Sequence, residues 1–260
     1  MKRIIGAFIL VYLLSGCGPS AGDGWLPVAL RACVKVGECG SGTSIRTADG
    51  KSLILTAAHL IPNSEKYVIV TVYGYDQRGL VDSVRHLPAK ILIAEPFTDT
   101  ALVEVETTIQ PGCIIAPYRL LTPGETLWSV GLPYVITPMV QRGVFAGRIM
   151  RGLSLSPLYS GGAVPGCSGS AVYDDYGCIR GVLTSRPGRP VTSKDGMLFR
   201  IDYFHHMNIF AEVSDQWIEM LLYAAKLRDE EKSNEHKSDS GRTSPSTQPA
   251  IDGITPGLDG

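Results

Sequence analysis

Residues 40–61 read GSGTSIRTADGKSLILTAAHLI. Two short blocks, at residues 42–46 and 52–55, have the β-branched and aliphatic composition of strands, and turn-forming residues separate them. The stretch therefore predicts two short strands joined by a turn. The second strand runs directly into small residues and a histidine, His59.

The same texture of short strands and turns extends over most of the chain. The sequence has 260 residues, of which 44% are hydrophobic, 29 are glycine and 17 are proline. This size suits one large domain or two small ones, and the composition favours an all-β fold. Strands are predicted at residues 28–36, 42–46, 52–55, 67–75, 90–94, 101–106, 126–130, 140–149, 171–173, 179–184 and 197–201.

Two segments interrupt this pattern. Residues 110–125, QPGCIIAPYRLLTPGE, carry few strand signals and divide the strand-bearing region into two similar halves, as an interdomain connection would. Residues 214–232 place apolar side chains at helical spacing, with Ser214 or Asp215 available as a cap, and predict an amphipathic helix packed against the preceding domain. Residues 233–260 are polar and rich in Gly, Pro and Ser, so we expect a disordered tail.

The amino terminus has the layout of an export signal. Lys2 and Arg3 precede an apolar run from Ile4 to Leu14, which is shorter than the roughly 20 residues that a membrane-spanning helix needs. The ending Leu-Ser-Gly-Cys resembles a bacterial lipobox, so we expect residues 1–17 to form a lipoprotein-type signal that ends at a lipidated Cys17. An ordinary cysteine is the alternative. The expected location is the bacterial cell envelope, with membrane attachment through the lipid anchor.

Charge and cysteine content limit which partners and which cellular compartment are compatible with the sequence. With 24 Lys and Arg against 25 Asp and Glu, the chain lacks the basic excess of nucleic-acid-binding proteins, so nucleic acid is excluded as a partner. Export implies an oxidising compartment in which the remaining five cysteines can pair. Cys33 and Cys39 flank a predicted turn and could close a hairpin or remain as two thiols.

A second stretch, residues 164–174, reads VPGCSGSAVYD and holds a candidate nucleophile between two glycines. A serine hydroxyl needs a histidine to take its proton and a buried carboxylate to orient that histidine. His59 follows a strand that reads as buried, and Asp99 stands at the start of the apolar strand in FTDTALVEV. The adjacent His205 and His206 lack a Cys or carboxylate at ligand spacing, so no metal site is predicted.

Taken in order, TAAH, DTALV and PGCSGS resemble the motifs of the trypsin-like serine peptidase superfamily, and most closely its bacterial exported HtrA-type branch. The resemblance covers roughly residues 28–205. It implies a chymotrypsin-like fold of two six-stranded antiparallel β-barrels, at residues 24–118 and 119–213, followed by the C-terminal helix. It also implies an endopeptidase with a protein or peptide substrate and no cofactor.

Residue roles follow from the same resemblance. Ser168 would be the nucleophile, His59 the general base and then general acid, and Asp99 the group that fixes the histidine tautomer. The backbone N–H groups of Gly166 and Ser168 would form the oxyanion hole. Thr184 stands where the family has a residue that hydrogen-bonds the triad aspartate.

Two departures from the family pattern limit what carries over. Cys167 replaces the aspartate that precedes the nucleophile in digestive enzymes, so activation by a newly cut amino terminus is not expected. Some viral relatives use a cysteine nucleophile, but theirs occupies the place of Ser168, which makes Cys167 a packing residue. Residues 233–260, beyond the predicted helix, are too few for a PDZ domain, so regulation by a PDZ module is not expected.

Substrate preference rests on the position six residues before the nucleophile, where trypsin has an acid and this chain has Gly162. Without that carboxylate a buried cationic side chain would remain unpaired, so small or apolar residues are expected before the scissile bond. Arg186 and Arg189, if near the pocket, would favour acidic residues instead.

Two other functions remain open at this stage. The chain could be a non-catalytic trypsin-fold binding or scaffold protein that retains triad-like residues, or an esterase that uses the same triad. The sequence lacks the GxSxG elbow of α/β-hydrolases, which places the esterase last. The oligomeric state cannot be read from the sequence.

Overall fold

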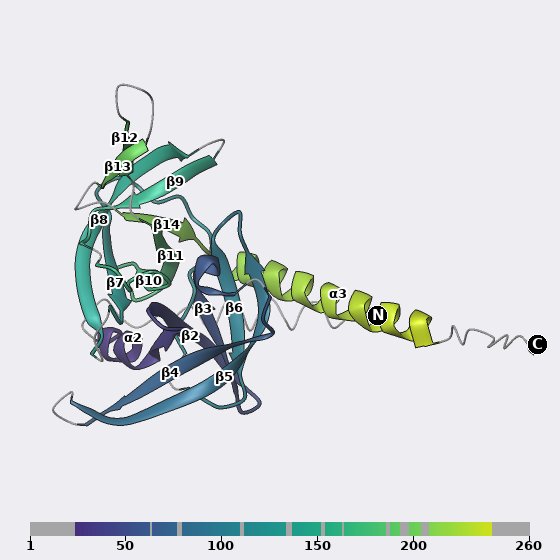
Figure 1. Cartoon of the computed structure of the whole chain (residues 1–260). Helices are drawn as coiled ribbons and strands as arrows, with labels where there is room; N and C mark the ends of the chain where they lie inside the picture. Colours follow the sequence, from purple (N-terminus) through teal and green to yellow (C-terminus); the bar gives the residue numbers. More distant parts are fainter. Residues whose placement is uncertain are drawn as a thin grey trace, which may run out of the picture.

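A computed structural model of the chain describes residues 24–62, 64–76, 80–109, 112–133, 137–151, 154–162, 164–185, 188–192, 198–203 and 208–240. In these residues two closed antiparallel β-barrels lie next to each other, and a long C-terminal helix projects away from them (Figure 1). The predicted all-β fold of two six-stranded barrels with a C-terminal helix is thereby confirmed.

The first barrel contains the stretch that opened the sequence analysis. Its strands close in the order β1-β2-β3-β6-β5-β4. Their bounds are β1 Cys33–Val36, β2 Gly40–Ala48, β3 Lys51–Thr56, β4 Tyr67–Tyr75, β5 Val81–Glu95 and β6 Thr100–Val105. Because β3 pairs with both β2 and β6, the segments that follow β3 and precede β6 meet at one end of the barrel.

The second barrel repeats this arrangement. Read from β7, its strands close in the order β7-β8-β9-β14-β11-β10. Their bounds are β7 Thr126–Gly131, β8 Met139–Arg151, β9 Ser154–Tyr159, β10 Ala171–Tyr173, β11 Ile179–Ser185 and β14 Asn208–Glu212. A separate hairpin, β12 Gly188–Thr192 with β13 Leu198–Tyr203, is inserted between β11 and β14.

Three clusters of buried side chains hold the barrels. One fills the first barrel around Ile54 and Val103, and another fills the second around Phe145 and Phe210. The third and largest cluster joins side chains of both barrels, among them Leu55 of β3, with the two helices. Burial of apolar surface in this shared cluster fixes the barrels against each other, because such burial stabilises by about 25 cal/mol per Å².

The helix α2, Leu26–Ala32, corrects the predicted strand at residues 28–36. Only Cys33–Val36 of that span forms a strand. Pro27 lies in the first turn and the rest of the segment is rich in helix-forming Ala and Leu, which outweighs the single β-branched Val28. Trp25, just before the helix, packs on Tyr173 of the second barrel with ring centroids 5.3 Å apart.

The helix α3, Asp215–Ser240, begins where the sequence predicted it and ends later. Ser214 caps it, because the backbone N–H of Trp217 donates to the Ser214 hydroxyl (3.2 Å). Residues 233–240 were expected to be disordered but continue the helix, since no glycine or proline occurs before Gly241. The helix contacts β5 of the first barrel and then extends away from the body (Figure 1).

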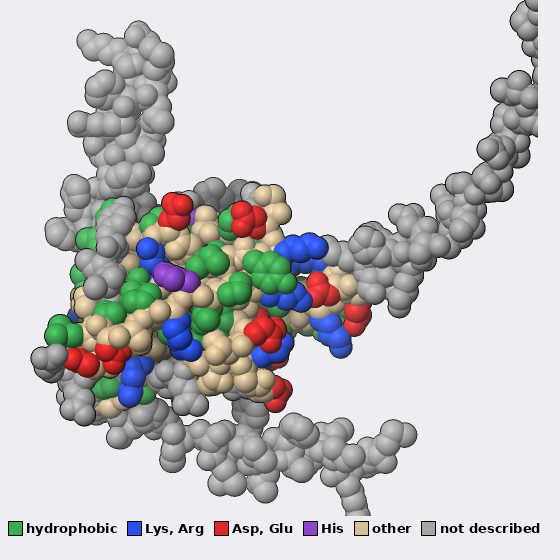
Figure 2. All heavy atoms as spheres, turned by 60° about the horizontal axis from the view of Figure 1, so that its bottom comes forward, with side chains coloured by type: hydrophobic (Ala, Val, Ile, Leu, Met, Phe, Trp, Pro, Cys, Tyr) green, Lys and Arg blue, Asp and Glu red, His purple; other side chains and the backbone are tan. Residues whose placement is uncertain are grey.

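Strands β9, β12 and β14 were not predicted, and β5 begins nine residues earlier than the predicted start at Lys90, at Val81. The missed part of β5 reads VDSVRHLPA, in which apolar and polar residues do not alternate and Pro88 interrupts the pattern, so a search for apolar alternation does not detect it. Figure 2 shows acidic and basic side chains mixed with hydrophobic ones on the face that it presents.

Three predicted features lie outside the described residues: the signal predicted at residues 1–17 with Cys17, the pair His205 and His206, and the tail from residue 241 to residue 260. Within the described part of the chain, no helix combines the length and the apolar character that crossing a membrane requires.

Candidate active site

His59 lies in a single 3-10 turn, Ala58–Leu60, that directly follows β3. Ala57 and Ala58 are buried and small, so another segment of chain can approach closely here. That segment carries Asp99, whose backbone carbonyl accepts the N–H of Ala58 (3.2 Å). The alanines of TAAH therefore allow the contact that places the aspartate beside the histidine.

The side chains of His59 and Asp99 are hydrogen-bonded. His59 Nδ1 lies 2.9 Å from Asp99 Oδ2 and 3.0 Å from Oδ1, and the backbone N–H of His59 donates to Oδ1 (2.9 Å). An ionised carboxylate only accepts hydrogen bonds, so the hydrogen on the ring stands on Nδ1. In the neutral imidazole this leaves the lone pair on Nε2, the tautomer that a general base requires.

Asp99 is held by the tight turn between β5 and β6. Its φ is +56°, a left-handed conformation that Asp tolerates better than most residues. Glu95 closes the turn by accepting hydrogen bonds from the backbone N–H groups of Phe97 (3.2 Å) and Thr98 (2.6 Å) and from the Thr98 hydroxyl (2.8 Å). Partial burial raises the pKa of Glu95, but these hydrogen bonds outweigh it and leave the pKa below its ordinary value.

Ser168 lies on a turn between β9 and β10 that two glycines shape. Gly166 and Gly169 have φ of +93° and +85°, which side chains disfavour. The N–H groups of Gly166 and Ser168 donate to no other residue in the described part of the chain, so both remain available to a ligand. The Ser168 hydroxyl donates a long hydrogen bond to the Thr184 carbonyl (3.4 Å).

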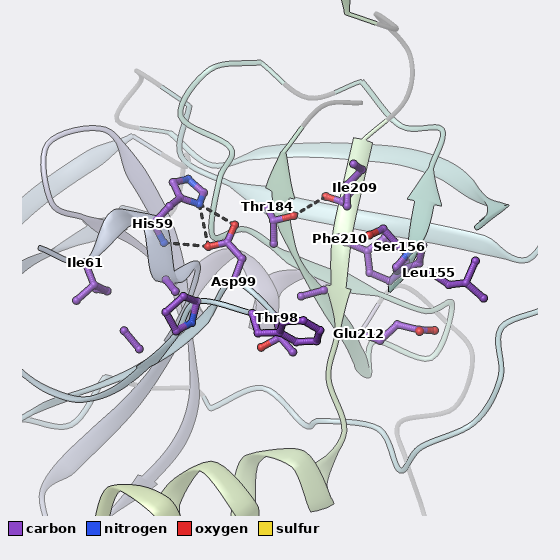
Figure 3. A pocket seen from close by; sticks show the side chains of 16 residues that line it. His59, Ile61, Thr98, Asp99, Leu155, Ser156, Thr184, Ile209, Phe210 and Glu212 are labelled. Carbon is purple, nitrogen blue, oxygen red and sulfur yellow. Dashed lines mark hydrogen bonds and ion pairs between the residues drawn. The ribbon is translucent and has the colours of Figure 1, made fainter. Parts of the chain in front are cut away.

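A cleft of about 940 Å³ lies between the barrels beside His59 and Asp99, and Ser168 is not among the residues that line it. His59 and Asp99 form one wall, and Thr184 and Ile209 face them from the second barrel (Figure 3). The rest of the lining is mostly apolar and includes the exposed side chain of Phe97. A peptide-sized ligand could lie along this cleft in contact with both barrels.

The structure brings some of the expected site residues together and separates others. His59 and Asp99 meet, whereas the hydrogen bond recorded for the Ser168 hydroxyl goes to Thr184 and not to His59. The sequence predicted a hydrogen bond from Thr184 to Asp99. In the structure the Thr184 hydroxyl donates instead to the Ile209 carbonyl (3.4 Å). The register of β11 against β14 determines that partner.

The cysteines do not form the disulfides that the sequence left open. Cys33, Cys39, Cys113, Cys167 and Cys178 are all without a disulfide. Cys33 is buried, and burial, with smaller effects from neighbouring thiols, raises its pKa far above the ordinary value, while Cys39 is exposed in the turn after β1. Cys167 is 4% exposed in the core of the second barrel, in keeping with a packing role.

Three residues with a part in the site were not singled out from the sequence. Glu95 and Thr98 order the turn that carries Asp99, and Ser41 binds the turn that carries Ser168. The flanking glycines of Gly40-Ser41-Gly42 were a usable signal, because glycine within a strand often marks close approach of another backbone. Arg186 lies outside the described residues, as does the side chain of Arg189.

Comparison with known proteins agrees with this architecture. The family model of the trypsin-like peptidase domain matches residues 40–182. Among solved structures, 432 chains match this chain. One is the crystal structure of the serine endoprotease from Yersinia pestis, with a TM-score of 0.54 and 21% sequence identity over 77% of this chain and 66% of that one. The chain thus spans about two thirds of that protein, and at this identity the likeness shows the fold alone.

The fold is that of the two-barrel peptidases, and the matched residues include His59, Asp99 and Ser168. The chain belongs to the trypsin-like peptidase domain family, which confirms the family predicted from the sequence. A search of curated protein sequences finds no significant match.

Proposed function

We propose that the protein is a serine endopeptidase in which His59, Asp99 and Ser168 form the catalytic triad. The observation that carries this proposal is the His59–Asp99 pair, held in the required tautomer at the edge of an interbarrel cleft. Membership in the trypsin-like peptidase family supports it independently.

The chemistry follows from these groups. Ser168 Oγ attacks the carbonyl carbon of the scissile bond while His59 Nε2 takes the hydroxyl proton, and the N–H groups of Gly166 and Ser168 stabilise the oxyanion. His59 then gives the proton to the leaving amine, which leaves an acyl-enzyme on Ser168. Water, activated by the same imidazole, hydrolyses this ester and restores the serine. Asp99 keeps the ring oriented and stabilises its charged form throughout.

For the proposed reaction, Ser168 Oγ must exchange its bond to the Thr184 carbonyl for one to His59. Rotation about the Cα–Cβ bond between staggered positions redirects the hydroxyl. The bond that is given up is long, at 3.4 Å, and therefore weak. Catalytic hydrogen bonds in unliganded sites often shorten only when substrate binds.

The cleft supports a preference for apolar or small side chains. Of the carboxylates that line it, Asp99 is bonded to His59, and Glu212 is paired with Arg148 (2.6 Å). No unpaired carboxylate among the described lining residues could neutralise a bound Lys or Arg side chain. Cleavage of a peptide library should therefore occur after small or apolar residues, and strong cleavage after Lys or Arg would refute this preference.

Labelling with a fluorophosphonate probe tests the triad, because the probe phosphonylates only an activated serine. The folded wild-type protein should react, while Ser168→Ala and His59→Ala should lose labelling and at least about 10⁴-fold of the peptidase activity. The bond from the Ser168 hydroxyl to Thr184 is the one observation that favours the alternative, a non-catalytic binding protein of this fold. Absence of labelling, or equal labelling of Ser168→Ala, would establish that alternative.

We further propose export and attachment to a bacterial membrane through a lipid on Cys17. The support is the arrangement of residues 1–17, with basic residues, a short apolar run and the Leu-Ser-Gly-Cys ending. Several acyl chains on one cysteine give stable attachment. Metabolic labelling with palmitate should mark the wild-type protein and not Cys17→Ala, and equal labelling of the two would contradict the anchor.

A further inference from the structure

The interface between the barrels at the nucleophile turn is formed around one buried hydroxyl. Ser41, in β2 of the first barrel, has no exposed surface. Its hydroxyl donates to the Gly166 carbonyl (2.8 Å) and accepts the backbone N–H of Leu132 (2.9 Å), and both partners belong to the second barrel. A third bond across the interface runs from the Ser41 N–H to the Ser168 carbonyl (2.7 Å).

Glycines allow this close contact. A Cβ on Gly169 would lie 1.9 Å from the Ser41 carbonyl oxygen, and one on Gly131 would lie 3.1 Å from the Ser41 hydroxyl oxygen. The Ser41 carbonyl in turn accepts the Thr56 hydroxyl (2.7 Å). Thr56 is the last residue of β3, three positions before His59, so Ser41 is linked to both the histidine segment and the nucleophile turn.

From this geometry we infer that Ser41 is a positioning residue for the oxyanion hole, which rests on the peptidase function proposed above. Gly166 supplies one of the two oxyanion donors and has no side chain to fix its backbone. Its φ of +93° leaves the direction of its N–H to the surrounding hydrogen bonds. The bond from Ser41 to the Gly166 carbonyl restrains this residue, and the Leu132 N–H fixes the hydroxyl that makes the bond.

The same three bonds also set the position of Ser168 relative to His59. The two side chains come from different barrels, and their alignment depends on how the nucleophile turn sits against β2. Ser41 binds that turn at the residue before Cys167 and at Ser168 itself. Without its hydroxyl, the turn keeps the Ser41 N–H bond but loses the restraint on Gly166.

Ser52 offers a matched control. It is also a buried serine of the first barrel, and its hydroxyl also joins two backbone groups, donating to the Thr107 carbonyl (2.9 Å) and accepting the Ile109 N–H (2.7 Å). Both of those partners follow β6, outside the cleft lining. Ser52→Ala therefore removes the same number and kind of bonds as Ser41→Ala without touching the nucleophile turn.

The test compares the two variants on a fluorogenic peptide chosen from the library. Ser41→Ala should lower kcat roughly tenfold to a hundredfold with KM little changed, because the lost interaction matters mainly in the transition state. Ser52→Ala should lower the thermal midpoint to a similar extent and retain the wild-type kcat. If kcat is the same in both variants, Ser41 contributes only to stability and the inference is overturned.

Ser41→Cys keeps an atom in the position of the hydroxyl oxygen and serves if Ser41→Ala does not fold. A thiol donates and accepts only weakly, so its kcat should also fall below the wild-type value. An unchanged kcat in Ser41→Cys would overturn the inference. If the wild-type protein neither cleaves the peptide nor reacts with the fluorophosphonate, the proposed function is refuted, and the role of Ser41 with it. If the wild-type protein is active, the kcat values of the Ser41 variants test the role of Ser41 alone.

Discussion

The two barrels share one strand order, β1-β2-β3-β6-β5-β4 in the first and β7-β8-β9-β14-β11-β10 in the second. They hold their functional groups differently. The first barrel fixes His59 and Asp99 by side-chain bonds within itself, and a carboxylate, Glu95, orders the turn between β5 and β6. The second barrel shapes the Ser168 turn with glycines and receives much of its support from Ser41 of the first barrel.

This difference shows how a site between two domains can be assembled. The acid–base pair is complete inside one barrel and does not depend on where the other barrel lies. The nucleophile turn is completed only when the barrels associate, because its bonds to Ser41 cross the interface. Substitutions around the His59–Asp99 pair should therefore act on proton transfer, and substitutions at the interface, Ser41 included, should act on the geometry of the nucleophile.

The largest effect is expected from Asp99→Asn. An amide that donates to Nδ1 leaves the proton on Nε2, so kcat should fall by about 10⁴-fold at neutral pH with little change in stability. Asp49→Asn is the control, since Asp49 has a similar positive φ of 52° in a turn of the same barrel, away from the cleft lining. Peptidase assays of both variants check this, and an active Asp99→Asn would remove Asp99 from the triad.

The next effect concerns the interface. Gly169→Ala combines an unfavourable φ with a clash against the Ser41 carbonyl, a backbone atom that cannot move aside, so we expect a loss of more than about 2 kcal/mol of stability. Gly50→Ala has a similar φ of +75° with open space around it and should lose only about 1 kcal/mol. Urea unfolding measures both, and equal losses would show that the close approach of the barrels carries no cost at Gly169.

The smallest effect is a dependence on acid pH. The pKa of Glu95 is lowered in the folded state, so its contribution to stability is present above the ordinary value of 4.5 and is lost as the pH falls through the lower folded value. Glu95→Gln should abolish this acid-dependent part, about 0.5 to 1 kcal/mol, and lower kcat by loosening the Asp99 turn.

Glu125, just before β7, provides the comparison in the second barrel. The hydrogen bond from Arg119 lowers its pKa to about 2, so its contribution is lost between about pH 4.5 and 2. Glu125→Gln should remove that dependence without changing kcat. Unfolding curves at several pH values, together with kcat at neutral pH, distinguish Glu95→Gln from Glu125→Gln. A normal kcat in Glu95→Gln would show that the turn holds Asp99 without the Glu95 carboxylate.

Much of this site could be predicted from local sequence. The turn around Ser168 needs glycine at two positions, and the approach of Asp99 to His59 needs alanine, so both requirements are visible in short motifs. The partner of Thr184 was not predictable, because it depends on the register between β11 and β14, which pairs residues 24 to 31 positions apart. The helix α2 was missed because short apolar segments lack a decisive period.

By itself, the sequence indicated the all-β class and, through short motifs that resemble those of trypsin-like peptidases, the two-barrel fold, the peptidase family and the candidate site residues, since each motif spans only a few neighbouring positions. Only the tertiary structure decided what holds these residues together across the interface. Ser41 and Gly166 are 125 positions apart, and their hydrogen bond exists only because the apolar cluster shared by the barrels brings β2 against the nucleophile turn. Contacts of this kind depend on packing and register, which no short stretch of residues specifies.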